Sequence, residues 1–126
     1  MTTRIASLLA AAALAGCGGG VVLSFGGDDD NPPSVSLAAG SEHAAPGEIV
    51  RLAAAASDDD FVVEVAFYRV ESDGSGSFIG ADTAAPYGWD AVMPAAPRGS
   101  TVTFAAHAYD SAGQRSDRAT VAVIAD

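Results

Sequence analysis

Residues 101–110 read TVTFAAHAYD, with apolar residues at every second position. Successive side chains of a β-strand point to opposite faces of its sheet, so this alternation predicts a strand with one buried face. We expect Val102, Phe104, Ala106 and Ala108 to face a hydrophobic core. The opposite face would then carry Thr101, Thr103, Ala105, His107 and Tyr109.

Six further segments have β character and are separated by clusters of turn-forming residues. They are expected at 34–37, 49–55, 62–70, 77–82, 87–93 and 118–125. Turn signals at intervals of roughly 8–12 residues are typical of β-sandwiches and barrels. The run LAAAA at 52–56 favours helix intrinsically, but its place between two β segments favours a strand. The sequence therefore predicts an all-β domain over residues 34–126, an antiparallel β-sandwich of about seven strands.

The large aromatic residues are expected to fill this core. In the segment 62–70 we expect Val63, Val65 and Phe67 to point inward, with Glu64 and Tyr68 outward. Trp89 alternates along its own segment and is most simply the buried tryptophan of a sandwich.

The predicted pairing of residues 62–70 with 101–109 determines which side chains are neighbours on the outer face of the sheet. An antiparallel register with residue 62 opposite residue 109 would separate Tyr68 and Tyr109 by roughly 20 Å, at about 3.4 Å per residue. That separation argues against a shared aromatic platform for carbohydrate. His107 would lie roughly opposite Glu64, as a solvent-exposed cross-strand contact.

The N-terminus has the order of a secretory signal. Arg4 precedes an apolar run over 5–14, and the small residues Ala15 and Gly16 precede Cys17. A basic start, an apolar core of roughly 7–15 residues and small residues at the cut site define such signals. The run is shorter than the roughly 20 apolar residues that span a bilayer. Residues 17–33 are rich in glycine and aspartate and have the composition of a flexible tether before the domain.

The run Leu14-Ala15-Gly16-Cys17 resembles the lipobox of a bacterial lipoprotein signal peptide. The resemblance implies that residues 1–16 are removed and that the Cys17 thiol carries diacylglycerol. Two or three acyl chains give stable membrane attachment, whereas one does not. An ordinary cleaved signal beside an unmodified thiol is the alternative. In a bacterium with two membranes, Gly18 stands where inner-membrane lipoproteins usually carry aspartate, which favours the outer membrane.

Five pieces of sequence carry a second resemblance. They are PSVSL at 33–37, ASDDD at 56–60, VAFY at 65–68, IGADTAAPYGW at 79–89 and AHAYDSAG at 106–113. In this order they resemble the bacterial immunoglobulin-like domains appended to secreted enzymes and surface proteins. The resemblance implies an immunoglobulin-like sandwich acting as a spacer, an adhesion unit or a carbohydrate-binding accessory, and not as a catalyst.

Phe61 departs from the family pattern, which usually has glycine after the acidic loop. An aromatic ring at a loop tip is a candidate ligand contact. The alternative is a ring tucked over the end of the core.

Acidic residues are predicted to gather at one end of the sandwich. If the strands alternate in direction, the segments 28–30 and 58–60 and Asp110 meet there. Ca²⁺ takes six to eight oxygen ligands, so Asp58, Asp60 and Asp110 are candidate calcium ligands. Cadherin-type sandwiches bind calcium with an acidic motif at this corner, which the chain partly resembles. The alternative is a solvated cluster in which Asp110 caps the loop after its strand.

Composition limits the function. The net charge of −10 argues against nucleic acid as a partner. The chain has two histidines and one cysteine, and no nucleophile stands with a base in a pattern typical of an active site. We therefore predict a non-catalytic module, lipid-anchored to the bacterial envelope, that acts in adhesion, binding or assembly with a protein or glycan ligand. The alternatives are a carbohydrate-binding accessory of a polysaccharide-degrading system and a small envelope hydrolase.

Overall fold

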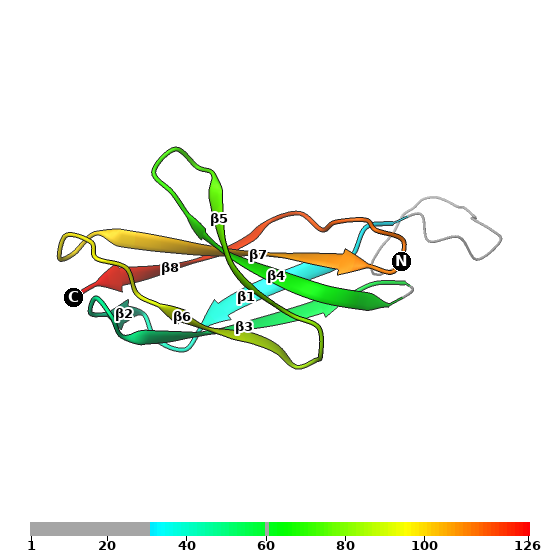
Figure 1. Cartoon of the computed structure of the whole chain (residues 1–126), viewed down its shortest axis with the longest axis horizontal. Coiled ribbons are helices and arrows are strands. Elements are labelled where there is room, and N and C mark those ends of the chain that lie inside the picture. The colour runs from blue at the N-terminus through cyan, green and yellow to red at the C-terminus, as the bar shows by residue number, and fades with distance from the viewer. Residues whose placement is uncertain (1–30, 60) are drawn as a thin grey trace, which may run out of the picture. The chain divides into compact units, whose positions relative to one another are not determined.

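The computed structural model describes residues 31–59 and 61–126, and this part of the chain consists of eight β-strands and their connections (Figure 1). The strands are β1 (Ser34–Ala39), β2 (His43–Ala44), β3 (Ile49–Ser57), β4 (Val62–Val70), β5 (Gly76–Asp82), β6 (Tyr87–Val92), β7 (Thr101–Asp110) and β8 (Ala119–Ala125). All seven predicted strands are present. The additional strand, β2, has two residues and is too short to show alternation in the sequence. Within the described residues, no helix is long and apolar enough to cross a membrane.

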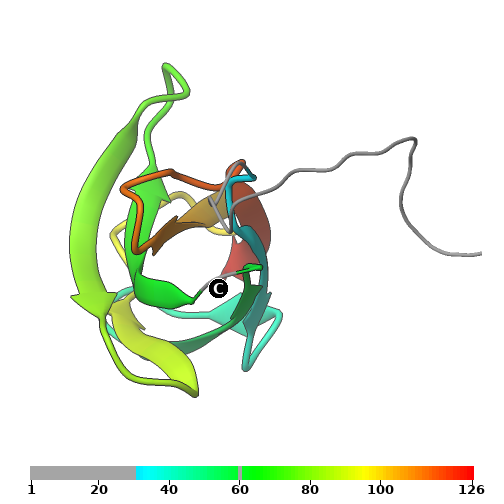
Figure 2. The same ribbon diagram turned by 90° about the vertical axis from the view of Figure 1, so that its right-hand side faces the viewer.

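The strands form two sheets, in the orders β1-β3-β6 and β2-β8-β7-β4-β5. Neighbouring strands are antiparallel, except for the short pair β2 and β8 at one edge. Viewed end on, the strands curve around a common core and the β4–β5 hairpin projects beyond them (Figure 2). The predicted immunoglobulin-like β-sandwich is therefore confirmed.

The core lies between the inner faces of the two sheets. Phe67, Phe104, Val65 and Val102 are buried, as the alternation predicts. The residues that β3 adds from the opposite sheet include Leu52, which is fully buried. Because β3 pairs with β1 on one side and β6 on the other, its alanine-rich segment is held as a strand despite its intrinsic helix propensity.

Trp89 lies at the rim of this core and not at its centre. Its side chain is half-buried and packs against the core residues, with its ring stacked on that of Phe67 at a centroid distance of 6.4 Å. The ring crosses directly over Gly80 of β5, where an added Cβ would come within 2.2 Å of it. Trp89 therefore closes the seam between β5 and β6, two strands that belong to different sheets.

The beginning of β4 corrects one prediction. A β-bulge between Val62 and Glu64 adds a residue to this strand opposite β7. The bulge turns Val62 toward the core and leaves Val63 37% exposed. The prediction that Val63 points inward is therefore wrong, because strict alternation does not hold through a bulge.

The β4–β7 register also differs from the prediction, by two residues. Tyr68 lies opposite Ala105, and His107 lies opposite Ala66 instead of Glu64. A shift of two residues leaves every side chain on its predicted face, so the inner and outer sets are unaffected. The shift does change which outer side chains are neighbours.

Candidate functional site

The described members of the predicted acidic cluster, Asp58, Asp59 and Asp110, lie at the end of the sandwich where β3 ends and β7 ends. Asn31 donates to the Asp59 carboxylate at 3.3 Å, and the Ser111 amide donates to the Phe61 carbonyl at 3.2 Å. These contacts bring together the start of the domain, the β3–β4 loop and the β7–β8 loop. Cys17, the predicted acidic segment 28–30 and Asp60 lie outside the described residues.

Asp110 caps the β7–β8 loop. Its side chain is buried, and its Oδ1 accepts hydrogen bonds from the amides of Ala112 at 3.0 Å and Gln114 at 2.7 Å. With its amide nitrogen turned toward Asp110, the Gln114 side chain also donates to Oδ2 at 3.0 Å. The capping alternative thus accounts for these contacts.

Among residues 31–59 and 61–126, no three histidine, cysteine or acidic side chains form a group that could hold a metal. Calcium binding through Asp58, Asp60 and Asp110 stays a prediction.

Phe61 lies in the β3–β4 loop, and its side chain is 59% exposed. The structure thus favours the exposed ring over a ring tucked across the core. Its backbone carbonyl accepts a hydrogen bond from the Ser111 amide, which ties Phe61 to the β7–β8 loop. A role of Phe61 in ligand contact stays a prediction.

Four rings lie on the outer face of the five-stranded sheet and form what we call the aromatic row. Its members are Phe78 of β5, Tyr68 of β4, and His107 and Tyr109 of β7. The ring centroids of Tyr68 and Phe78 are 5.8 Å apart, and those of Tyr68 and His107 are 5.6 Å apart. Both contacts are edge-to-face, with interplanar angles of 70° and 81°. Phe78 is 63% exposed, so the row is open to solvent at its β5 end.

Hydrogen bonds orient the rings at the centre of the row. His107 Nδ1 lies 3.0 Å from the Ser116 carbonyl oxygen, which can only accept, so Nδ1 carries the proton. In the neutral imidazole this leaves Nε2 as an acceptor. Burial, together with a side-chain hydrogen bond to Tyr109, raises the pKa of Tyr68 to about 12. The Tyr68 hydroxyl therefore stays protonated at neutral pH.

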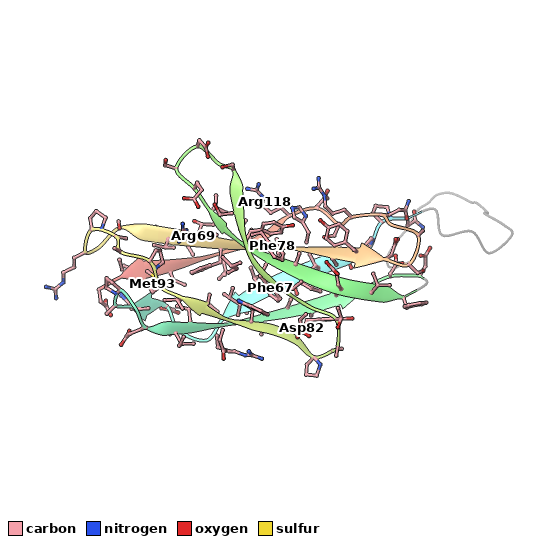
Figure 3. The ribbon with its side chains drawn as sticks, viewed as in Figure 1. Phe67, Arg69, Phe78, Asp82, Met93 and Arg118 are labelled. Carbon is pink, nitrogen blue, oxygen red and sulfur yellow. The ribbon has the colours of Figure 1, made fainter. Side chains whose placement is uncertain are left out.

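Charged residues of both signs border the aromatic row. The charges of Arg115 and Glu64 act on Tyr68 in opposite directions, Arg115 lowering its pKa and Glu64 raising it. Arg118 lies next to β8, and its Nη1 donates to the Gly74 carbonyl at the tip of the β4–β5 hairpin at 3.1 Å. Figure 3 labels Arg118 and Phe78 near this hairpin. The hairpin tip is thus tied back across the sheet, on the side where the row lies.

Sequence reasoning missed the aromatic row for two reasons. The predicted register separated Tyr68 from Tyr109 by two residues more than the structure does. Nothing in the sequence pattern marks Phe78 as a site residue. The β4–β5 hairpin loop could have predicted the neighbour of Tyr68. Its turn, with Gly74 at a φ of 88°, sets Val70 opposite Gly76. The same register then places Tyr68 opposite Phe78.

A shallow groove of about 420 Å³ lies elsewhere, at the seam between β5 and β6. It is lined by Arg51, Ala81, Asp82, Gly88, Trp89 and Asp90. Arg51 pairs with Asp90 across the strands at 3.0 Å, and both side chains are more than half exposed. Hydrogen bonds from the amides of Gly88 and Ala84 lower the pKa of Asp82. The charged side chains Arg51, Asp82 and Asp90 thus each have a structural partner, and the aromatic row is the stronger candidate site.

The structure resembles solved structures of fibronectin(III)-like modules. It matches the structures described as fibronectin(III)-like modules of Clostridium thermocellum CbhA with a TM-score of 0.61 and 26% sequence identity. The match covers 75% of this chain and 47% of that chain, so this chain spans about half the length of the protein it matches. No curated protein matches the sequence. The sequence model of the family described as the bacterial Ig domain matches residues 33–101, more than half of the chain, and the protein therefore belongs to the bacterial Ig domain family.

Proposed function

We propose that this bacterial Ig domain protein is a lipid-anchored, non-catalytic binding module of the bacterial envelope that holds its ligand on the aromatic row. The observation that carries the proposal is the set of outward-facing rings on three neighbouring strands. Cross-strand aromatic contacts of this kind also stabilise a sheet, but Phe78 adds a ring that is 63% exposed. Tyrosine and other aromatic residues are enriched among the anchors of binding surfaces.

The surroundings of His107 support a binding role over a catalytic one. Its ring contacts the ring of Tyr68, and its Nδ1 bonds to the Ser116 carbonyl. A general base needs a nucleophile within hydrogen-bond reach, and neither of these neighbours is an activated nucleophile. The membership of the bacterial Ig domain family and the similarity to fibronectin(III)-like modules support an accessory role as well.

The anchoring part of the proposal rests on the sequence. The lipobox-like run ending in Cys17 and the tether composition of residues 17–33 support an exported domain held at a membrane. In wild type we expect the protein in the membrane fraction, with the mass of a lipid-modified chain beginning at Cys17. Cys17→Ser should move it to the soluble fraction or leave the signal uncleaved. An unmodified thiol on the mature wild-type chain would rule out this anchor.

A binding assay with the native envelope tests the site. In the Cys17→Ser background, which removes attachment through the lipid, the purified protein should bind isolated envelope material, and Phe78→Ala/Tyr109→Ala should reduce that binding. The matched control is Ile49→Ala/Val92→Ala, because this exposed cross-strand pair lies on the other sheet, with side chains 57% and 59% exposed. Equal binding by wild type and both double variants would refute the aromatic row as the site.

A further inference from the structure

We infer that the aromatic row binds a single chain of a neutral polysaccharide, lying across β5, β4 and β7. This inference rests on the proposed function and names the class of its ligand. It depends on the spacing of the rings, their tilt, and the polar groups beside them.

The spacing of the rings repeats across the sheet. Phe78, Tyr68 and His107 belong to three successive strands, and their ring centroids are 5.8 Å and 5.6 Å apart. Both distances are ordinary for aromatic rings in edge-to-face contact, and they give the row a regular repeat that a polymer of flat units can follow. The apolar C–H faces of sugar rings pack on aromatic rings, so an extended polysaccharide presents the matching series of faces.

The tilt of the rings selects the form of the polymer. Successive rings are turned by 70° and 81°, so they do not share one plane. A crystalline polysaccharide offers a flat surface, which needs coplanar rings. In a single soluble chain each sugar unit can rotate relative to the previous one, so successive units can contact rings that are turned relative to one another. The geometry therefore favours a soluble chain over a crystalline surface.

The polar groups beside the row match hydroxyl groups. A hydroxyl both donates and accepts hydrogen bonds. The row offers donors in Arg115 and Arg118 and acceptors in Glu64 and, when neutral, in Nε2 of His107. Because the charged side chains beside the row are both basic and acidic, they do not favour a polymer of either charge. The net charge of −10 on the whole chain also repels an anionic polymer. A neutral, hydroxyl-rich ligand is the class that fits both facts.

Much of the row is held in place by the protein itself. The Ser116 carbonyl orients His107, and the Tyr68 ring lies against the backbone at Gly76, where an added Cβ would come within 3.3 Å of it. Arg118 holds the hairpin tip through Gly74. Side chains that are ordered before binding lose less conformational entropy when the ligand arrives.

Affinity electrophoresis tests this inference on the full chain, purified in a detergent without a sugar headgroup. The gels would contain hydroxyethyl cellulose, xyloglucan or mixed-linkage β-glucan as neutral chains, and polygalacturonate as an anionic one. Microcrystalline cellulose would be tested by sedimentation. We expect at least one neutral chain to retard the protein and to bind more tightly than polygalacturonate, with no binding to the crystalline material. Phe78→Ala/Tyr109→Ala should weaken binding roughly tenfold, as expected for the loss of two aromatic contacts. Ile49→Ala/Val92→Ala should bind like wild type.

The outcomes separate the inference from the proposed function. If binding to native envelope depends on the aromatic row but no neutral polysaccharide binds, or if polygalacturonate or crystalline cellulose binds better, the inference is overturned and the proposed function stands. If the Phe78→Ala/Tyr109→Ala variant binds both envelope and polysaccharide like wild type, both are overturned.

Discussion

Gly80 shows how one residue type permits a contact that no other would allow. The Trp89 ring lies where a Cβ at position 80 would be, and that ring is fixed by stacking on Phe67. A methyl group there must displace a large side chain packed against the core. The closed seam between β5 and β6 therefore depends on the absence of a side chain at position 80.

Gly80→Ala should destabilise the domain by about 1–3 kcal/mol, the usual cost of overpacking. For a domain of this size, each kcal/mol corresponds to a melting-temperature shift of about 4–8 °C. Gly40→Ala is the matched control, because its added Cβ meets neighbouring atoms at 3.5 Å, an ordinary contact distance. Urea unfolding followed by Trp89 fluorescence measures both. Equal midpoints for the two variants would show that the ring moves aside without cost.

Tyr68 gives a second prediction at this scale. Its pKa is about 12 in the folded chain, against 10.0 for an ordinary tyrosine. The folded state thus holds the proton more tightly, so the stability that Tyr68 contributes is fully present below pH 10 and is lost as the pH rises toward 12. Ultraviolet titration of tyrosinate should show a late component that Tyr68→Phe removes. A late component that persists in this variant would contradict the assignment.

One carboxylate, that of Asp110, stabilises the β7–β8 loop through hydrogen bonds to its backbone. Asp110 accepts both the Ala112 and the Gln114 amides on one oxygen. Asp110→Ala should cost about 1–3 kcal/mol, because two partly buried amide donors lose their acceptor. Asp110→Asn should cost less, since its amide oxygen can still accept. Asp117→Ala in the same connection should change stability by no more than about 0.5 kcal/mol, because the Asp117 side chain is exposed. Thermal unfolding compares the three variants, and equal losses for Asp110→Ala and Asp117→Ala would count against the cap.

Strands β4 and β7 mark the limit of what alternation can predict. A period of two assigned the inner face of β7 correctly, from Val102 to Ala108, because misplacing it by one residue would have exposed the whole set. A shift of β4 against β7 by two residues leaves every apolar side chain on the buried face, so hydrophobicity does not distinguish the two registers. The aromatic row depends on the register and was therefore missed, whereas the core was not.

The bulge at Val62 and the position of Trp89 at the rim of the core could not be predicted from the alternation for another reason. Both are settled by contacts between strands far apart in the chain, of Val62 with Asp110 and of Trp89 with Gly80. Sequence periodicity describes one segment at a time and holds no information on such contacts. The family resemblance supplied the arrangement of strands but not these local departures.

At the scale of the whole molecule, calcium is the prediction still to be tested. Asp58 follows β3, whereas Asp110 ends β7 and already caps the β7–β8 loop. Calcium that binds only the folded chain adds about 2.7 kcal/mol at a hundredfold excess over Kd. Melting temperatures of the full chain in chelator, in CaCl₂ and in NaCl of equal ionic strength should show a rise specific to calcium. Asp58→Asn/Asp60→Asn should abolish the rise, whereas equal shifts in both salts would mean screening alone.

The place where the chain enters the sandwich has a mechanical consequence. Asn31 is held by Asp59 and, through its carbonyl, by Gln114, and β1 then runs beside β3 for six residue pairs from Ser34. If the domain is held by its N-terminal side while a ligand pulls on the opposite sheet, the part of the pull that is directed along β1 loads the β1–β3 ladder in shear. The hydrogen bonds to β3 lie across that direction and share the force together instead of opening one after another. Resistance to forced unfolding is set by the unfolding rate, so this ladder makes the domain suited to staying folded under tension.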